Sequence, residues 1–286
     1  MLAIRTLLLQ ACQRGLPALE AKLLFMQATG LNRTQLITQA DGVVEPAQQQ
    51  VFEALVQRRL QGEPVAYLLG YREFFSLDFL VSPATLIPRP ETECLVEQSL
   101  KILQTMHMRD PCATVARVLD LGTGSGVIGV TLAYHLPHVQ MVMTDQSPDA
   151  LAVAQQNAQR LLPTQTLCTF RLGNWWQALA GEDREFDLIV SNPPYIALHD
   201  PHLEQGDLRF EPRTALTDQD DGLSAMRLII QGAPAYLRKG GFILLEHGYD
   251  QAPAIAALLV KAGFVDCFCY RDYAGIPRVS GGCLPD

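Results

Sequence analysis

The feature that most constrains the fold of this chain is a regular alternation of short apolar runs with longer segments of helical spacing after residue 115. The short runs, such as "VQMVMTD", are predicted to be strands, and they are bounded by turn residues. Strands are predicted at 116–122, 139–145, 166–173, 186–192, 240–248 and 264–272, and helices at 127–136, 147–162, 222–237 and 251–263. This alternation predicts an α/β, Rossmann-like fold: a mostly parallel sheet with helices on both faces, which binds ligands at the carboxyl ends of its strands.

The first part of the chain has a different pattern. Four helices are predicted at 2–14, 17–29, 32–40 and 46–61, and no candidate catalytic group stands out among them. From Tyr71 the period becomes that of a strand pair, "EFFSLDFLVSP", and a proline-stiffened connection, "ATLIPRPETE", leads into a further helix. We therefore predict a helical domain at 1–70, a β-hairpin and proline-rich linker at 71–92, and the sheet domain at 93–286.

Charge and hydropathy exclude two classes of protein. The formal net charge is −8 and the pI about 5.2, and residues 1–70 carry six Lys/Arg against five Asp/Glu, so the acidity belongs to the rest of the chain. An acidic chain lacks the basic face that nucleic acid requires. No stretch approaches the ~18–20 uninterrupted apolar residues of a membrane span. The N-terminal run contains Arg5 and no cleavage site, so it predicts a helix rather than a signal peptide. We expect a cytoplasmic protein that binds neither membrane nor nucleic acid.

The cysteines and histidines predict neither a disulfide framework nor a metal site. The seven cysteines form no C-x-x-C pair, and the close histidine pairs at 135–138 and 199–202 have no cysteine nearby. Scattered thiols are typical of a cytosolic protein. The cysteines are Cys12, Cys94, Cys112, Cys168, Cys267, Cys269 and Cys283.

The glycine run "LDLGTGSGVIG" admits two interpretations. Gly124, Gly126 and Gly129 satisfy G-x-G-x-x-G, and Asp145 follows the first of them by 21 residues, as in a dinucleotide-binding fingerprint. The run also reads D-x-G-x-G-x-G from Asp120, the pattern typical of S-adenosylmethionine-dependent methyltransferases. A carboxylate beside the loop disfavours a pyrophosphate but suits a ligand with a sulfonium and an α-amino group. The loop therefore favours methyl transfer, and Asp145 can bind ribose hydroxyls in either case.

The stretch "SNPPYI" follows a predicted buried strand and has the chemistry to orient a planar nitrogen. An amide or exocyclic amine nitrogen is a poor nucleophile because its lone pair is delocalised. Two acceptors that hold its two N–H groups can orient it toward a methyl donor. The side-chain oxygen of Asn192 and the carbonyl of Pro193 are suited to that role. Pro193 and Pro194 stiffen the turn without adding an N–H, and Tyr195 offers a flat face. A turn that merely ends a strand is the alternative interpretation.

The chain resembles the release factor glutamine methyltransferases, the PrmC/HemK family, over nearly its full length. The segments that carry the resemblance are "GEPVAYLLGYREFFSLDFLVSPATLIPRPETE", "VLDLGTGSG", "FDLIVSNPPYI", "EPRTALTDQDDGLSAMRLII" and "LLEHGYDQ". The resemblance implies an N-terminal helical bundle, a β-hairpin linker and a seven-stranded methyltransferase domain. It also implies an activity: methylation of the side-chain nitrogen (N5) of the glutamine in the Gly-Gly-Gln motif of peptide chain release factors, which supports translation termination. The methyl donor would be S-adenosylmethionine.

The resemblance also assigns site residues. Those implied for the cofactor are Gly122, Thr123, Gly124, Ser125, Gly126, Asp145, Trp175 and Asn192, and those implied for catalysis and for the target glutamine are Asn192, Pro193, Pro194 and Tyr195. Trp175 would flank the adenine, although a core position is the alternative.

Two positions depart from the family pattern, and the role of two acids stays open. Asn174 stands where the family usually has an acid, and Pro277 where many members carry a polar or acidic residue. Glu91 and Glu93 could approach the active site or serve the start of a helix.

Three rival functions remain from the sequence. An adenine-N6 nucleic-acid methyltransferase also uses an N/D-P-P-Y motif but would need a basic face. An inactive methyltransferase-like scaffold does not account for intact motifs, and an NAD-dependent oxidoreductase leaves "NPPY" unexplained. We expect a monomer whose partners are release factors, with the helical domain at 1–70 as their docking surface.

Overall fold

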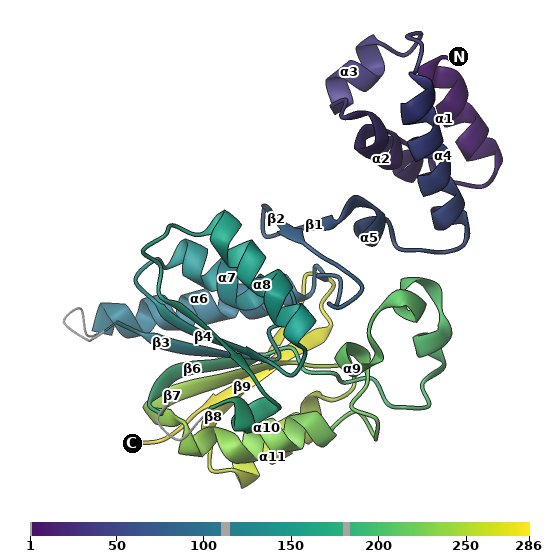
Figure 1. Cartoon of the computed structure of the whole chain (residues 1–286). Coiled ribbons are helices and arrows are strands. Elements are labelled where there is room, and N and C mark those ends of the chain that lie inside the picture. Colours follow the sequence, from purple (N-terminus) through teal and green to yellow (C-terminus); the bar gives the residue numbers. More distant parts are fainter. Residues whose placement is uncertain (1, 110–114, 180–183) are drawn as a thin grey trace. The chain divides into compact units, whose positions relative to one another are not determined.

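The computed structural model describes residues 2–109, 115–179 and 184–286 (Figure 1). The chain forms two compact units. One takes in the chain up to Tyr71 together with Glu204–Phe210, and the other takes in Arg72–Leu203 and Glu211–Asp286. Cys112 lies outside the described residues, and Cys12, Cys94, Cys168, Cys267 and Cys269 are free thiols. Within the described ranges, no helix is both long and apolar enough to cross a bilayer.

The first unit is a small helical bundle built on apolar packing. Phe25 and Phe52 lie at its centre with ring centroids 5.1 Å apart in an edge-to-face contact. The predicted helices form, and a short fifth helix that the periodicity did not indicate follows them. They are α1 (Ile4–Gln13), α2 (Ala18–Thr29), α3 (Arg33–Thr38), α4 (Pro46–Leu60) and α5 (Val65–Leu69). Pro46 begins α4, where a missing N–H costs nothing.

Glu204–Phe210 belongs to this unit although it lies far along the chain. Arg59 forms ion pairs with both Glu20 of α2 (2.6 Å) and Asp207 (3.4 Å). Two short turns, η2 (Pro201–Glu204) and η3 (Gly206–Phe210), carry the chain through this region, and α9 (Arg213–Leu216) follows. The segment that follows "NPPY" thus contributes residues to the helical unit.

The linker forms the predicted hairpin. Strands β1 (Tyr71–Phe74) and β2 (Leu77–Leu80) pair across Phe75 and Ser76, which both have positive φ. Side chains with a Cβ are unfavourable in this conformation, and two carboxylates stabilise it. Glu93 accepts from the Phe75 N–H at 3.0 Å, and Glu73 accepts from the Ser76 N–H at 2.7 Å. Glu93 therefore braces the hairpin turn.

The second unit is a seven-stranded sheet with the strand order β5-β4-β3-β6-β7-β9-β8. The neighbours from β5 to β7 are parallel, and β9 is antiparallel to both β7 and β8. The α/β class and the seven-stranded sheet are confirmed. The strands are β3 (Arg117–Leu121), β4 (Gln140–Asp145), β5 (Cys168–Leu172), β6 (Phe186–Ser191), β7 (Leu237–Glu246), β8 (Val265–Arg271) and β9 (Pro277–Cys283).

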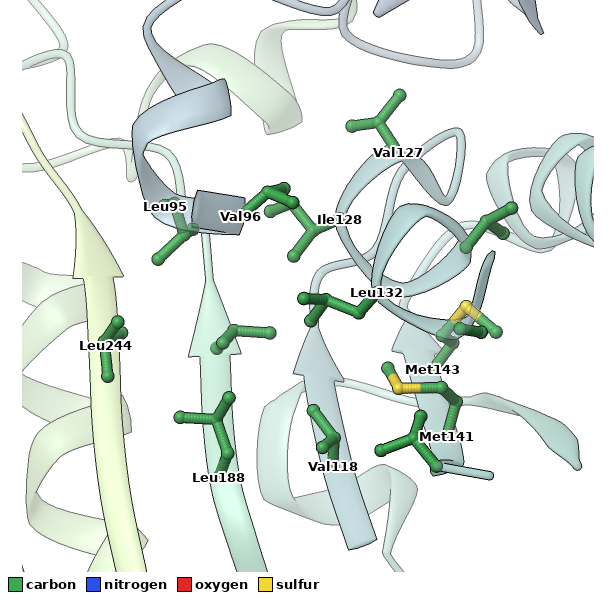
Figure 2. Close-up of a cluster of buried hydrophobic side chains, with 14 of the residues drawn as sticks. Leu95, Val96, Val118, Val127, Ile128, Leu132, Met141, Met143, Leu188 and Leu244 are labelled. Atoms are coloured by element: carbon green, nitrogen blue, oxygen red, sulfur yellow. The ribbon is translucent and has the colours of Figure 1, made fainter. Parts of the chain in front are cut away.

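Helices cover both faces of this sheet (Figure 1). On one face, α6 and α7 pack their apolar side chains onto β3, β4, β6 and β7; Figure 2 shows Leu95, Ile128 and Leu132 above Val118 and Leu188. On the other face, α10 and α11 bury Met226, Ile229 and Ile255. The helices are α6 (Thr92–Arg109), α7 (Val127–His135), α8 (Pro148–Leu161), α10 (Ser224–Gly232), continued by the short turn η4 (Ala233–Ala235), and α11 (Ala252–Lys261).

The last two strands, β8 and β9, form a hairpin. Pro277 is the first residue of β9, a position where a strand tolerates the missing N–H. The turn before it is organised by Asp272, whose Oδ1 accepts from the N–H groups of Ala274 and Ile276 at 2.9 Å each, and whose Oδ2 pairs with Arg278. The departure at Pro277 is therefore compatible with a complete sheet.

Candidate active site

The strand order brings the two sequence motifs together. Strands β3 and β6 are neighbours although their last residues, Leu121 and Ser191, are 70 positions apart in the sequence, and these two residues pair in the parallel register. The Ser191 hydroxyl donates to the Leu121 carbonyl at 2.6 Å, which ties the two strand ends. Gly122 and Asn192 are the next residues on each strand. The glycine loop and "NPPY" therefore emerge side by side at the carboxyl edge, where the strand order reverses direction.

A pocket lies at this edge of the sheet. The glycine loop, the end of β4, the residues around Trp175, "NPPY" and the proline-rich linker all contribute to its wall. The predicted site residues that line it are Gly122, Thr123, Gly124, Ser125, Asp145, Trp175, Asn192 and Pro194. The pocket is also lined by residues that were not predicted from the sequence, among them Thr85, Arg89, Thr92 and Thr214. Gly126, Pro193 and Tyr195 are not among the described residues that line it.

The glycines of the loop serve different purposes. Gly122 has φ +71, and a Cβ there would lie 3.3 Å from the Trp175 ring. Gly124 has φ +56 and open space beside it, so the backbone is exposed to a ligand. Gly126 begins α7, and a Cβ there would lie 3.1 Å from Val130 and 3.2 Å from Ala154. The glycine at position 126 therefore allows α7 to pack closely against α8.

Asp120 braces the loop from beneath. Its side chain is fully buried, and its Oδ2 accepts from the Thr123 hydroxyl (2.6 Å) and from the Gly129 N–H (3.0 Å). Burial raises the pKa of Asp120 to about 6, against the opposing effect of these hydrogen bonds. Asp120 is not among the described pocket-lining residues. The structure thus gives it a role in holding the loop, whereas the sequence suggested one toward the ligand.

Asp145 ends β4 and faces the pocket. Its Oδ2 accepts from the Gly124 N–H and its Oδ1 from the Ser147 N–H, both at 2.9 Å. Burial raises the pKa of Asp145, opposed by the backbone hydrogen bonds from Ser147 and Gly124. Each carboxylate oxygen retains acceptor capacity for a further donor. Asp145 is therefore placed to bind hydroxyl groups of a ligand in the pocket.

The two adjacent tryptophans lie in different environments. Trp175 has an unusual φ of +47 and lines the pocket beside Gly122. Trp176 stacks on Tyr236 with ring centroids 4.6 Å apart and donates its indole N–H to the Leu228 carbonyl. Strained backbone conformations are common at binding sites. Trp176 is the structural residue of the pair, Trp175 offers its ring to the pocket, and Asn174 lines the same wall.

The "NPPY" turn is held from two sides. The Asn192 Nδ2 donates to the hydroxyl of Thr92 at 3.3 Å, and the Tyr195 hydroxyl donates to Glu246 Oε1 at 3.4 Å. Glu246 is buried, which raises its pKa to about 7, and burial together with the negative Glu246 raises the pKa of Tyr195. Gln251 also donates to the Tyr195 carbonyl at 3.0 Å. Tyr195 thus anchors the turn in the protein.

Two further contacts connect the linker to the site. Asn157 of α8 donates to the carbonyls of Leu80 (3.0 Å) and Ser125 (2.8 Å) and accepts from the Leu80 N–H (2.8 Å), so one buried amide joins the hairpin to the glycine loop. Glu211 is buried, accepts from the Ile87 N–H at 2.9 Å and pairs with Arg89. The sequence shows the family motif "PRPETE". The hydrophobic pattern does not predict which side chains Arg89 and Thr92 contact.

Both the helical part and the sheet part of the chain are similar in sequence to known proteins. Residues 2–70 match the PrmC N-terminal domain family and residues 98–206 the methyltransferase small domain family. A release factor glutamine methyltransferase from Bordetella pertussis is 51% identical over 94% of this chain and 96% of its own length. The protein of the same name from Escherichia coli is 45% identical over 93% and 92%. The chain belongs to the release factor glutamine methyltransferase family. The resemblance inferred from the motifs is confirmed.

Solved structures of other proteins have a fold similar to that of this chain. A methyltransferase from Pyrococcus furiosus is 17% identical, with a TM-score of 0.51 over 80% of this chain and 98% of its own. The hMettl16 catalytic domain is 16% identical, with a TM-score of 0.58 over 82% and 81%. At such identity the likeness concerns the fold alone. It agrees with the α/β fold of the sheet unit. Among the described residues, no cluster of three or more His, Cys, Asp or Glu side chains could hold a metal ion.

Proposed function

We propose that this chain methylates the side-chain amide nitrogen (N5) of the glutamine in the Gly-Gly-Gln motif of peptide chain release factors, with S-adenosylmethionine as methyl donor. The observation that carries the proposal is the pairing of β3 with β6, which brings Gly122 and Asn192 to one pocket. The substrate follows from relatives of that name at 45–51% identity over nearly the whole chain.

The residues of the pocket fit the proposed methyl donor. Asp145 has acceptor capacity for the ribose hydroxyls, Trp175 offers a flat ring for the adenine, and the open backbone at Gly124 allows close approach. Thr123 and Ser125 complete the loop, and Gly126 supports it through helix packing. When bound, S-adenosylmethionine supplies an electrophilic methyl carbon.

The task of "NPPY" is to orient a weak nucleophile. The Asn192 Oδ1 and the Pro193 carbonyl accept the two N–H groups of the glutamine amide, which favours the pyramidal nitrogen that the reaction requires. Pro193 and Pro194 fix the turn. Asn192 is neutral and serves as an acceptor rather than a strong base, so the proton is released to solvent after transfer. Tyr195 holds the turn through Glu246.

The helical unit is proposed as the docking surface for the release factor. Its described residues offer exposed apolar side chains, among them Leu19 and Ile37, and no catalytic constellation. We propose that the enzyme works as a monomer in the cytoplasm and that its partners are release factors.

Mass spectrometry tests the proposal directly. Intact release factor, a Gly-Gly-Gln peptide and an adenine-containing oligonucleotide are each incubated with the protein and S-adenosylmethionine. We expect a single added methyl group, 14 Da, on the glutamine of the factor and none on the oligonucleotide. Methylation of adenine alone would favour the rival activity, and no methylation of any substrate would reject both.

A further inference from the structure

Two buried polar side chains are connected to both ends of the "NPPY" turn. Thr92 is the first residue of α6 and is 2% exposed, and Glu246 is the last residue of β7 and is 1% exposed. The Thr92 hydroxyl is hydrogen-bonded to Glu246 and also receives the Asn192 Nδ2–H at 3.3 Å. Tyr195 donates to the same carboxyl. The first and last side chains of "NPPY" thus both connect to Glu246.

Burying this carboxyl is costly. The Glu246 Oε2 has no hydrogen-bond partner among the described residues, and an unpaired buried acceptor destabilises the folded state. The charged neighbours are Arg278 of β9, which stabilises the carboxylate, and Glu91, which opposes it. Apolar side chains would fill the same space without this cost, so a structural role alone does not account for Glu246.

The hydrogen-bond chain has a direction that begins at the carboxylate. When Glu246 is ionised, above its pKa of about 7, its carboxylate can only accept, so the Thr92 hydroxyl donates its proton to it. The Thr92 oxygen is then left as an acceptor, and Asn192 can only present its Nδ2–H to it. The carboxamide oxygen is consequently the branch left for the pocket. With the amide reversed, Asn192 would present N–H groups to the N–H groups of the target glutamine, and the contact would be repulsive.

We propose that Thr92 and Glu246 are positioning residues that hold the Asn192 carboxamide with its oxygen available to the target nitrogen. The proposal rests on the methyl-transfer function stated above. Thr92 lines the pocket, and Glu246 is not among the described lining residues. Their effect is transmitted through the orientation of one side-chain amide.

Thr92→Val tests the chain because it removes the hydroxyl and keeps the shape. We expect kcat on release factor to fall on the order of tenfold, the effect of losing one buried hydrogen bond, with KM and the affinity for S-adenosylhomocysteine changed less than about twofold. Thr92→Ser keeps the hydroxyl and should restore most of kcat. The matched control is Thr131→Val in α7, where a buried hydroxyl bonded to the Val127 carbonyl is removed; its kcat should equal that of the wild type.

A double-mutant cycle separates orientation from stability. Aspartate at position 192 has two equivalent oxygens and cannot be reversed, so Thr92→Val added to Asn192→Asp should cost little further kcat. Equal losses in both backgrounds, or a wild-type kcat in Thr92→Val, would overturn the proposal. Wild-type protein that fails to methylate release factor would instead reject the proposed function. Calorimetric binding of S-adenosylhomocysteine by each variant verifies that it is folded.

Discussion

The two units of this chain differ in what they bury. In the helical unit, the described buried side chains are apolar or aromatic, as in the Phe25–Phe52 pair. The sheet unit buries Asp120, Asn157 and Glu246 as well, and each lies close to the carboxyl edge of the sheet. Buried polar groups are expensive unless they are satisfied. Asp187, near the start of β6, is buried as well and pairs with Arg238. The sheet unit therefore buries polar groups both around the pocket and away from it, whereas the described core of the helical unit is apolar.

The largest effect on stability is expected from Phe52→Ala in the helical unit. The Phe52 side chain is 2% exposed, and removing a buried phenyl ring typically costs about 3–5 kcal/mol. Because the pocket belongs to the sheet unit, affinity for S-adenosylhomocysteine should stay near that of the wild type. If the helical unit is the docking surface, KM should rise for intact release factor and not for a Gly-Gly-Gln peptide.

Phe79→Ala is the matched change in the sheet unit, where Phe79 is fully buried. Unlike Phe52→Ala, Phe79→Ala should weaken the binding of S-adenosylhomocysteine. Chemical denaturation and calorimetry on both variants provide the comparison. An equal KM of wild type and Phe52→Ala for the intact factor would contradict the docking role.

Asn192→Ala should abolish most turnover with little loss of stability. Removing one preorganised contact to a reacting group typically costs ~2.7–4 kcal/mol, or on the order of 10²–10³ in kcat. Asn192→Asp keeps an acceptor but adds negative charge near the sulfonium, which stabilises the ground state more than the transition state. We therefore expect kcat to rank Asn above Asp above Ala in single-turnover assays, with no weaker cofactor binding by the Asp variant. If the Ala variant has the kcat of the wild type, Asn192 does not position the substrate, and "NPPY" is only a turn.

The buried acid of the sheet unit should make stability depend on pH. The folded-state pKa of Glu246, about 7, exceeds its ordinary value of 4.5, so between these values the folded protein holds a proton that the unfolded chain has released. The free energy of unfolding therefore decreases as pH rises from about 4.5 to 7 and levels off above 7, by an amount on the order of 3 kcal/mol.

Glu246→Gln should remove this contribution. The difference between the wild type and this variant isolates Glu246, because Asp120, with its pKa of about 6, titrates in both proteins. Denaturant unfolding at several pH values measures the slope, and Glu45→Gln on the exposed surface of the helical unit serves as control. The same slope in wild type and Glu246→Gln would show that the carboxyl is not the titrating group.

The fold could be predicted from the sequence because periodicity reports burial. Continuous apolar runs such as "FDLIV" predict strands that helices cover on both faces. The glycine loop and "NPPY" are recognisable from short sequence motifs. Strand β9 was harder, since "PRVSGGC" is rich in glycine and begins with proline. The contacts of Thr92, Asn157 and Glu246 depend on which strands and helices become neighbours. No local pattern contains that information, so sequence reasoning overlooked Glu246.

The smallest effect is expected from Asp145→Ala, and it tests whether the pocket edge binds the cofactor. Loss of charge-assisted hydrogen bonds to the ribose should weaken S-adenosylmethionine binding by about 1–3 kcal/mol. The same carboxylate accepts from Gly124 and Ser147, so part of the loss could arise from a loosened loop. Asp145→Asn is the intermediate change, because its amide lacks the charge and keeps only one of the two oxygens that accept from Gly124 and Ser147. Calorimetry should place Asn between Asp and Ala, and unchanged affinity in folded Asp145→Ala would remove Asp145 from the cofactor site.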